Sequence, residues 1–294
     1  MQRTRPHARP AAVREGGGLM ALAWQDLARD ILADPDHFID ERDRRRLLPF
    51  TQRMFPTYQP VPHHLLIANC LEAVARRDLD RFIAVLPPRF GKSTLCSEHF
   101  PAWFLGNHPD ERIIACSHTA HLAYHFSHRV RDLVANPAWP FPDVRIARDE
   151  GAKSIWGIDG HRGGYVAAGV GGSITGFGAN VLLIDDAVKS AAEADSQTFR
   201  DAAWEWFTGT ALTRIEPNGA AVVIGTRWHE ADLIGRILNG PDSNRWAVLH
   251  VPALSEGDTV YANITLPIDV AETLGIHEGD SLPLEAGSFR AQGR

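Results

Sequence analysis

Short apolar runs alternate with amphipathic stretches through the central part of the chain. The apolar runs are rich in β-branched residues, which is typical of strands. They occupy residues 82–86, 113–117, 181–184 and 221–225. Stretches with helical spacing of apolar residues follow the last three of these runs, at residues 122–134, 191–207 and 230–238. This alternation predicts an α/β fold with a mainly parallel sheet flanked by helices.

The chain outside this core follows other patterns. Helical spacing predicts helices over residues 21–33 and 65–76, so residues 20–80 are expected to form a helical lead-in. Residues 1–19 are rich in Arg, Pro, Ala and Gly, which predicts a disordered or mis-assigned extension, with Met20 as an alternative start. The core is assigned to residues 81–251, and residues 252–294 are expected to be a degenerate tail.

The first apolar run leads into a loop that ends in Gly91, Lys92 and Ser93, where a helix is expected to begin. A strand, a tight loop and a helix in this order are the context of a phosphate-binding P-loop. Loop amides and the helix N-terminus surround a phosphate group, and glycine lets the backbone approach it closely. We therefore expect Lys92 to reach the β- and γ-phosphates of ATP and the Ser93 hydroxyl to bind Mg²⁺.

This loop departs from the standard P-loop pattern in one place, because Leu86 occupies a position that is usually glycine. Arg89 lies inside the loop and has two interpretations, a catalytic contact to the γ-phosphate or a surface arginine. The residues predicted to bind nucleotide are Pro88, Arg89, Phe90, Gly91, Lys92, Ser93 and Thr94.

The third apolar run ends in two adjacent carboxylates, Asp185 and Asp186. ATP hydrolysis needs one carboxylate to hold magnesium and another to orient or deprotonate the attacking water. At the carboxyl end of a parallel strand, both groups would face a bound phosphate. We assign the metal role to Asp185 and the water role to Asp186, whereas an isolated acidic pair would more often be a strand end or a helix cap.

Charge and composition narrow the classes of function. The net charge is -6 and the pI is about 6.1, so any contact with DNA must be local and not an extended basic surface. The cysteines, Cys70, Cys96 and Cys116, lack metal-ligand spacing and are expected in the core of a protein from a reducing compartment. No apolar run reaches the length of a membrane helix, which predicts a cytoplasmic protein.

Four segments in order along the chain resemble signatures of phage and prophage terminase large subunits. These are residues 87–93 (PPRFGKS), 171–176 (GGSITG), 183–190 (LIDDAVKS) and 225–233 (GTRWHEADL). The resemblance implies a P-loop ATPase of the RecA/ASCE type that couples Mg-ATP hydrolysis to translocation of double-stranded viral DNA into a procapsid. The implied partners are DNA, a portal protein and a small terminase subunit, and the implied state on the portal is a homo-oligomer in the cytoplasm of the host cell.

The resemblance also assigns roles to single residues. Lys92 and Ser93 correspond to Walker A residues, Asp185 to the Walker B acid, and Asp186 to the catalytic acid, which is often glutamate in this family. Thr226 and Arg227 correspond to a motif that couples hydrolysis to domain movement. If their strand lies beside the P-loop strand, their hydroxyl and guanidinium groups are expected near the γ-phosphate. The alternative for Arg227 is pairing with Asp232 or Glu230.

Two departures from the family pattern leave alternatives open. Arg89 lies two residues before Gly91, whereas some family members place their loop arginine one residue earlier, so the resemblance leaves both interpretations of Arg89 open. Terminases also carry a C-terminal nuclease with clustered carboxylates, for which the sequence after Val251 is too short, so we expect no nuclease activity. The alternatives are a truncated prophage relic or partner subunit that binds ATP without productive packaging, and a helicase-like DNA translocase.

Overall fold

The computed structural model describes residues 35–147, 153–252, 262–266, 281–284 and 287–292. The expectations for residues 1–19, for a helix over residues 21–33 and for most of residues 252–294 fall outside the described residues. The chain divides into two units, residues 1–42 and 43–294, and the strands and the candidate site belong to the second. Helix α2 spans Pro35–Arg45.

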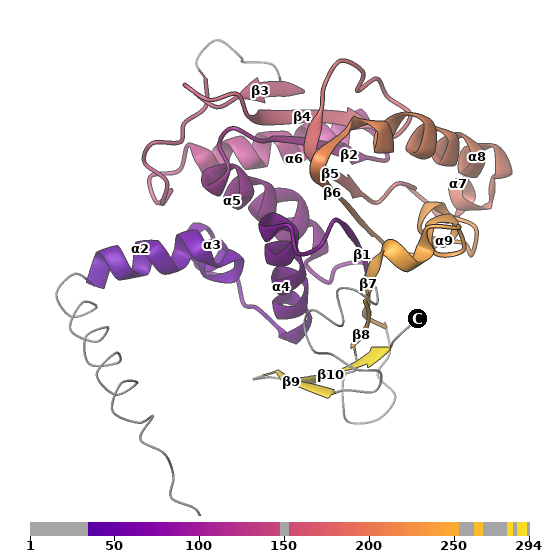
Figure 1. The fold of residues 1–294 in the computed structure, drawn as a ribbon, viewed down its shortest axis with the longest axis horizontal. Helices are drawn as coiled ribbons and strands as arrows, with labels where there is room; N and C mark the ends of the chain where they lie inside the picture. Colours follow the sequence, from indigo (N-terminus) through magenta and orange to yellow (C-terminus); the bar gives the residue numbers. More distant parts are fainter. Residues whose placement is uncertain (1–34, 148–152, 253–261, 267–280, 285–286, 293–294) are drawn as a thin grey trace, which may run out of the picture. The chain divides into compact units, whose positions relative to one another are not determined.

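The described strands form one sheet in the order β3-β4-β2-β5-β6-β1-β7-β8-β10-β9 (Figure 1). Six neighbouring strands from β4 to β7 are parallel, which confirms the predicted mainly parallel α/β sheet. Antiparallel pairs β3·β4, β7·β8 and β9·β10 occur toward the edges. The strands are β1 (Arg81–Val85), β2 (Arg112–Ser117), β3 (Ile155–Gly157), β4 (Gly164–Gly169), β5 (Ala179–Asp185), β6 (Ile215–Gly225), β7 (Ala247–His250), β8 (Ala262–Thr265), β9 (Ser281–Leu284) and β10 (Gly287–Gln292).

Helices cover both faces of this sheet (Figure 1). One core cluster joins the sheet to α3 (Leu47–Met54), α4 (Pro62–Arg76), the π-helical segment η1 (Thr94–His99), α5 (Phe100–Asn107) and α6 (Ala120–Val134). The second cluster joins the other face to α8 (Gln197–Trp206), the π-helical segment η2 (Phe207–Ala211) and α9 (Leu233–Leu238). The remaining short segments are α7 (Ala191–Asp195), η3 (Leu212–Arg214) and η4 (Ser243–Arg245).

Strand β1 shows why its sequence is apolar without alternation. Phe82 and Ala84 belong to the first core cluster, whereas Ile83 and Val85 belong to the second. Successive side chains of a strand point to opposite faces, so a strand covered by helices on both sides must be apolar at every position. Burial of each large apolar side chain contributes about 1.5–3 kcal/mol, which makes this central strand a principal source of stability.

The helix expected over residues 191–207 is interrupted in the structure. It ends as α7 and restarts as α8 after Ser196, whose backbone is extended. The Ser190 hydroxyl accepts a hydrogen bond from the Glu193 amide at the start of α7. The helix expected from residue 230 begins only at Leu233, because the Asp232 carboxylate caps it by accepting the Gly235 amide.

Several buried elements were not predicted from the sequence. Strand β4 has glycine at both ends, which is typical of a loop, yet it is buried between β2 and β3. Strand β7, which borders β1, was also missed, whereas helices α3 and α5 were expected without bounds, as part of the helical lead-in and of the helix after the P-loop. The predicted core cysteines are free and buried, in agreement with expectation. Within the described residues, no helix combines the length and apolar character needed to cross a membrane.

Candidate nucleotide-binding site

The sheet brings three segments of the predicted site to one edge. Strand β6 lies between β1 and β5, with Gly225 paired to Val85 and Ile224 paired to Asp185. The segments that follow these three parallel strands therefore meet at the carboxyl edge, where ligands bind in open α/β sheets. Strand β1, which leads into the loop with Lys92, is thus separated by β6 from β5, which ends in Asp185.

The entrance to the P-loop is tied to the end of β6. The Leu86 amide donates to the Gly225 carbonyl at 3.2 Å, and the Thr226 hydroxyl donates to the Leu86 carbonyl at 3.0 Å. Leu86 is buried in the first core cluster, so this position extends the strand instead of forming a glycine turn. Its departure from the standard P-loop pattern follows from this packing.

The tight part of the P-loop contains two left-handed residues, Arg89 with φ 65° and Gly91 with φ 72°. Such φ values favour glycine because a side chain is strained there. At Gly91 there is also no space, since a Cβ atom would lie 2.5 Å from Nε2 of His64. Arg89 is exposed, and its guanidinium forms no ion pair with the described residues. Both interpretations of Arg89 therefore stay predictions.

Lys92 and Asp186 meet directly at this edge. The Lys92 side chain is largely buried, and Nζ lies 2.9 Å from Oδ2 of Asp186. Asp186 has a left-handed φ of 47°, and its amide donates to the Ile224 carbonyl. Its second carboxylate oxygen, Oδ1, accepts the Thr226 amide at 3.1 Å. The backbone of β6 thus fixes the carboxylate that faces the lysine.

Asp185 is buried at the end of β5, and within the described structure only one of its two carboxylate oxygens accepts a hydrogen bond. The Ser97 hydroxyl donates to Oδ2 at 2.7 Å, whereas Oδ1 has no hydrogen-bond partner among the described residues. Burial, reinforced by the charge of Asp186, raises the pKa of Asp185 to about 6, although hydrogen bonds from Ser97 and Ser93 and the charge of Lys92 act in the opposite direction. A buried carboxylate oxygen without a partner is suited to an ion or its water.

Asp185 and Ser93 therefore fit a magnesium ion. In the described part of the chain, no cluster of three or more His, Cys, Asp or Glu side chains is arranged to hold a metal. Mg²⁺ is usually bound by one or two protein groups together with phosphate oxygens and water. The donor set is thus of the kind that binds magnesium only together with a phosphate-bearing ligand.

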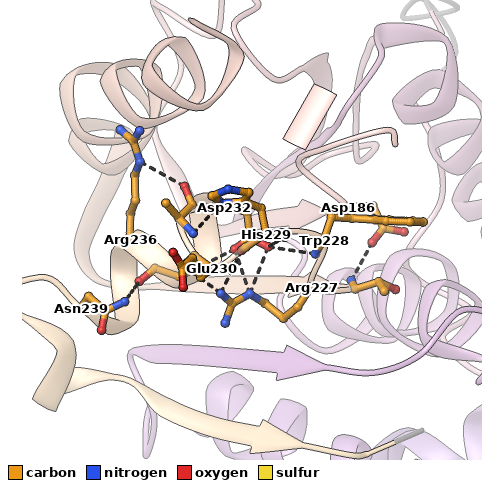
Figure 2. Close-up of polar contacts among 11 residues, drawn as sticks. Asp186, Arg227, Trp228, His229, Glu230, Asp232, Arg236 and Asn239 are labelled. Carbon is orange, nitrogen blue, oxygen red and sulfur yellow. Dashed lines mark hydrogen bonds and ion pairs between the residues drawn. The ribbon is translucent and has the colours of Figure 1, made fainter. Parts of the chain in front are cut away.

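The Arg227 side chain points away from Asp186 and toward the loop that precedes α9 (Figure 2). Its Nε lies 2.9 Å from Oδ1 of Asp232, and its Nη2 donates to the carbonyls of His229 and Glu230 at 3.1 Å. The structure therefore shows the alternative of pairing with Asp232, while Glu230 contributes its carbonyl and not its carboxylate. The guanidinium group thus links residues at both ends of the loop between β6 and α9.

Asp232 is the centre of that loop. Its carboxylate also accepts the amides of Trp228 and Gly235, at 3.1 and 2.8 Å, as Figure 2 shows for Trp228. One buried side chain thus fixes the loop, pairs with Arg227 and caps α9. Thr226 and Arg227 consequently act on different partners, the P-loop entrance and the α9 loop.

Four residues near the site were not singled out from the sequence. Ser97 bonds Asp185, and the His118 amide donates to the Asp186 carbonyl at 3.1 Å. His63 and His64, at the start of α4, contact the Phe90 carbonyl of the P-loop. Ser97 follows Ser93 by one helical turn, a spacing that could have revealed it. The other contacts join distant segments and leave no local signal.

A family model described as "Terminase large subunit, T4likevirus-type, N-terminal" matches residues 83–280. No curated relative matches the chain significantly. Among solved structures, the large terminase of bacteriophage HK97 is 18% identical with a TM-score of 0.47, over 72% of this chain and 45% of that one.

Two structures of the large terminase from a thermophilic bacteriophage are also similar. The complex with ATP-gamma-S is 15% identical with a TM-score of 0.37, over 59% of this chain and 39% of that one. The complex with ADP is 14% identical with a TM-score of 0.39, over 61% and 44%. The chain spans less than half the length of each of these proteins. Because the family model covers more than half of the chain, the chain belongs to the terminase large subunit family.

Proposed function

We propose that this chain binds and hydrolyses Mg-ATP at the carboxyl edge of β1, β5 and β6. The observation that carries the proposal is the contact between Lys92 and Asp186, 2.9 Å apart, beside the buried Asp185. A phosphate-binding lysine, a metal-binding acid and a water-activating acid are the groups that phosphoryl transfer to water requires. Here they lie on neighbouring elements of one sheet edge.

Each residue has a defined part in this proposal. The loop of residues 88–94 surrounds the phosphates, with the amides of residues 89–94 as donors, and Lys92 neutralises the charge of the β- and γ-phosphates. Ser93 and Asp185 would hold Mg²⁺, which neutralises further charge on the transferred phosphoryl group. Asp186 orients the attacking water and accepts its proton. Arg89 is exposed at the loop and is proposed to contact the γ-phosphate.

Family membership extends the proposal from hydrolysis to DNA packaging. We propose residues 81–251 as the motor core that couples hydrolysis to translocation of double-stranded DNA, in a homo-oligomer on a portal with a small terminase subunit. Thr226 supports coupling because its hydroxyl holds the P-loop entrance while its amide bonds Asp186. A movement of the P-loop entrance would therefore be transmitted through Thr226 to Asp186, and a movement of Asp186 to the P-loop entrance.

The test is the Mg²⁺-dependent ATPase rate of the purified chain beside Lys92→Ala and Asp186→Asn, with Lys153→Ala as a control. Lys153 is an exposed lysine before β3. We expect turnover in the wild type and the control, and a loss of about 100-fold or more in both site variants. Measurable turnover at equal rates in all four proteins would contradict the assignment. ATP binding without turnover in the wild type would instead support a relic or partner subunit.

A further inference from the structure

Two histidines of α4 hold the P-loop from outside the predicted site. Nε2 of His63 lies 3.2 Å and Nε2 of His64 lies 3.0 Å from the carbonyl oxygen of Phe90. His64 is buried, and its ring packs 5.3 Å from the ring of Tyr58. The His63 ring lies 5.3 Å from that of Phe90. Both contacts join residues that are more than twenty positions apart in the sequence.

The direction of these hydrogen bonds follows from the other ring nitrogen of His64. Its Nδ1 accepts the Val61 amide at 3.2 Å, so Nδ1 carries no proton. The proton of the neutral ring is therefore on Nε2, which donates to the Phe90 carbonyl. A carbonyl oxygen only accepts, so His63 must also donate through Nε2. Burial lowers the pKa of both histidines, which favours the neutral ring.

Two donors on one carbonyl determine how the next amide points. The C=O and N–H groups of a trans peptide point in opposite directions. With the Phe90 oxygen held against α4, the Gly91 N–H must point away from α4. Among the described residues, no acceptor is bonded to this amide. A Cβ atom at Gly91 would lie 2.5 Å from Nε2 of His64, so glycine is required for this close approach.

We propose that His63 and His64 are positioning residues that set the Phe90–Gly91 peptide so that the Gly91 amide donates to a phosphate group of the bound nucleotide. The inference rests on the proposed function and adds two residues from outside the loop to it. If the Phe90–Gly91 peptide group could rotate freely, it would have to be ordered when nucleotide binds, and this ordering would lower the affinity.

The experiment compares donors with shape-matched side chains that cannot donate. Gln places an amide N–H near the position of Nε2, whereas Phe keeps an aromatic ring without a donor. His64→Gln and His63→Gln are expected to bind ADP within about twofold of the wild type. His64→Phe and His63→Phe are each expected to bind ADP about two- to tenfold more weakly, the effect of one lost hydrogen bond. His128→Phe, on the exposed face of α6, is the control.

A labelled-glycine NMR signal gives a second readout, which a purely structural role would leave unchanged. In the wild type and the Gln variants, ADP should shift the Gly91 amide signal strongly, and in the Phe variants the shift should be reduced. If His64→Phe does not fold, His63→Phe and the NMR signal decide the question. Equal ADP affinity and equal Gly91 shifts in folded Gln and Phe variants would overturn the positioning role. Absence of ADP and ATP binding by the wild type would instead overturn the proposed function itself.

Discussion

Lys92 and Asp186 form an ion pair in which Nζ and Oδ2 are 2.9 Å apart. The two residues follow different strands, β1 and β5, and meet only because β6 holds the two strand ends at one level. The same lysine is the proposed ligand of the β- and γ-phosphates. A bound nucleotide must therefore compete with Asp186 for Lys92, so the acid that is proposed to activate water also opposes nucleotide binding.

Asp186→Asn should separate these two effects. The variant loses the proton acceptor, so we expect kcat to fall by about 100-fold or more. It also loses the charge that holds Lys92, so ADP affinity should be unchanged or a few-fold tighter. The measurements are steady-state ATPase kinetics and ADP titration, with Lys92→Ala as the variant that should lose affinity. Weaker ADP binding by a folded Asp186→Asn protein would refute the competition.

Asp185→Asn is expected to stabilise the protein while removing its use of magnesium. Folding raises the pKa of Asp185 from 3.8 to about 6, so the ionised carboxylate destabilises the fold above about pH 6. This penalty disappears as the pH falls to 3.8, where the group is protonated in both states. At pH 7.5 the variant should gain about 1–3 kcal/mol in free energy of unfolding. Urea unfolding at pH 7.5 and pH 4 measures the gain, which should be smaller at pH 4.

Asp185→Asn is also expected to abolish the dependence of nucleotide binding on Mg²⁺. An amide is a weaker ligand for magnesium than a carboxylate, whereas Ser97 can still donate to the Asn oxygen. The variant should therefore bind ADP equally with and without Mg²⁺. Asp159→Asn, which changes an exposed acid after β3, is the matched control. Retained magnesium dependence in Asp185→Asn would exclude Asp185 as a metal ligand.

Arg227→Lys tests whether the α9 loop depends on the shape of the guanidinium. Arg227 pairs with the buried Asp232 and also donates to two carbonyls, a geometry that one ammonium group cannot reproduce. We expect a loss of about 1–3 kcal/mol in free energy of unfolding, although the charge is conserved. Arg131→Lys, on α6, is the comparison. A stability equal to that of the wild type would show that charge alone is sufficient.

Acid sensitivity should depend on His99. This buried ring donates through Nδ1 to the Thr94 carbonyl at 2.9 Å, and burial lowers its pKa from 6.5 to about 4. A depressed histidine pKa means that stability is lost as the pH falls from 6.5 toward 4, by up to about 3 kcal/mol. His99→Asn keeps a donor near Nδ1 but does not titrate. Its melting temperature should fall less between pH 7 and pH 5 than that of the wild type, while His128→Asn should match the wild type.

Patterns of neighbouring residues were sufficient to predict the central strands of the fold and part of the candidate site. The strands around residues 82–86, 113–117, 181–184 and 221–225 are apolar on both faces, and the structure confirms each of them. The P-loop and the acidic pair each follow an apolar strand, and the carboxyl ends of parallel strands lie at one edge of a sheet. Strand β4 was missed because its burial depends on neighbours, not on its glycine-bounded sequence.

The sequence by itself determined the parallel α/β architecture, the P-loop and the acidic pair, because each depends on residues that are close together in the chain. Only the tertiary structure decided which partners these groups have. It paired Lys92 with Asp186, turned Arg227 onto Asp232 and brought His63 and His64 to the Phe90 carbonyl. Hydrogen bonds and ion pairs depend on distances of a few ångströms between side chains, and those distances are set by how strands and helices pack.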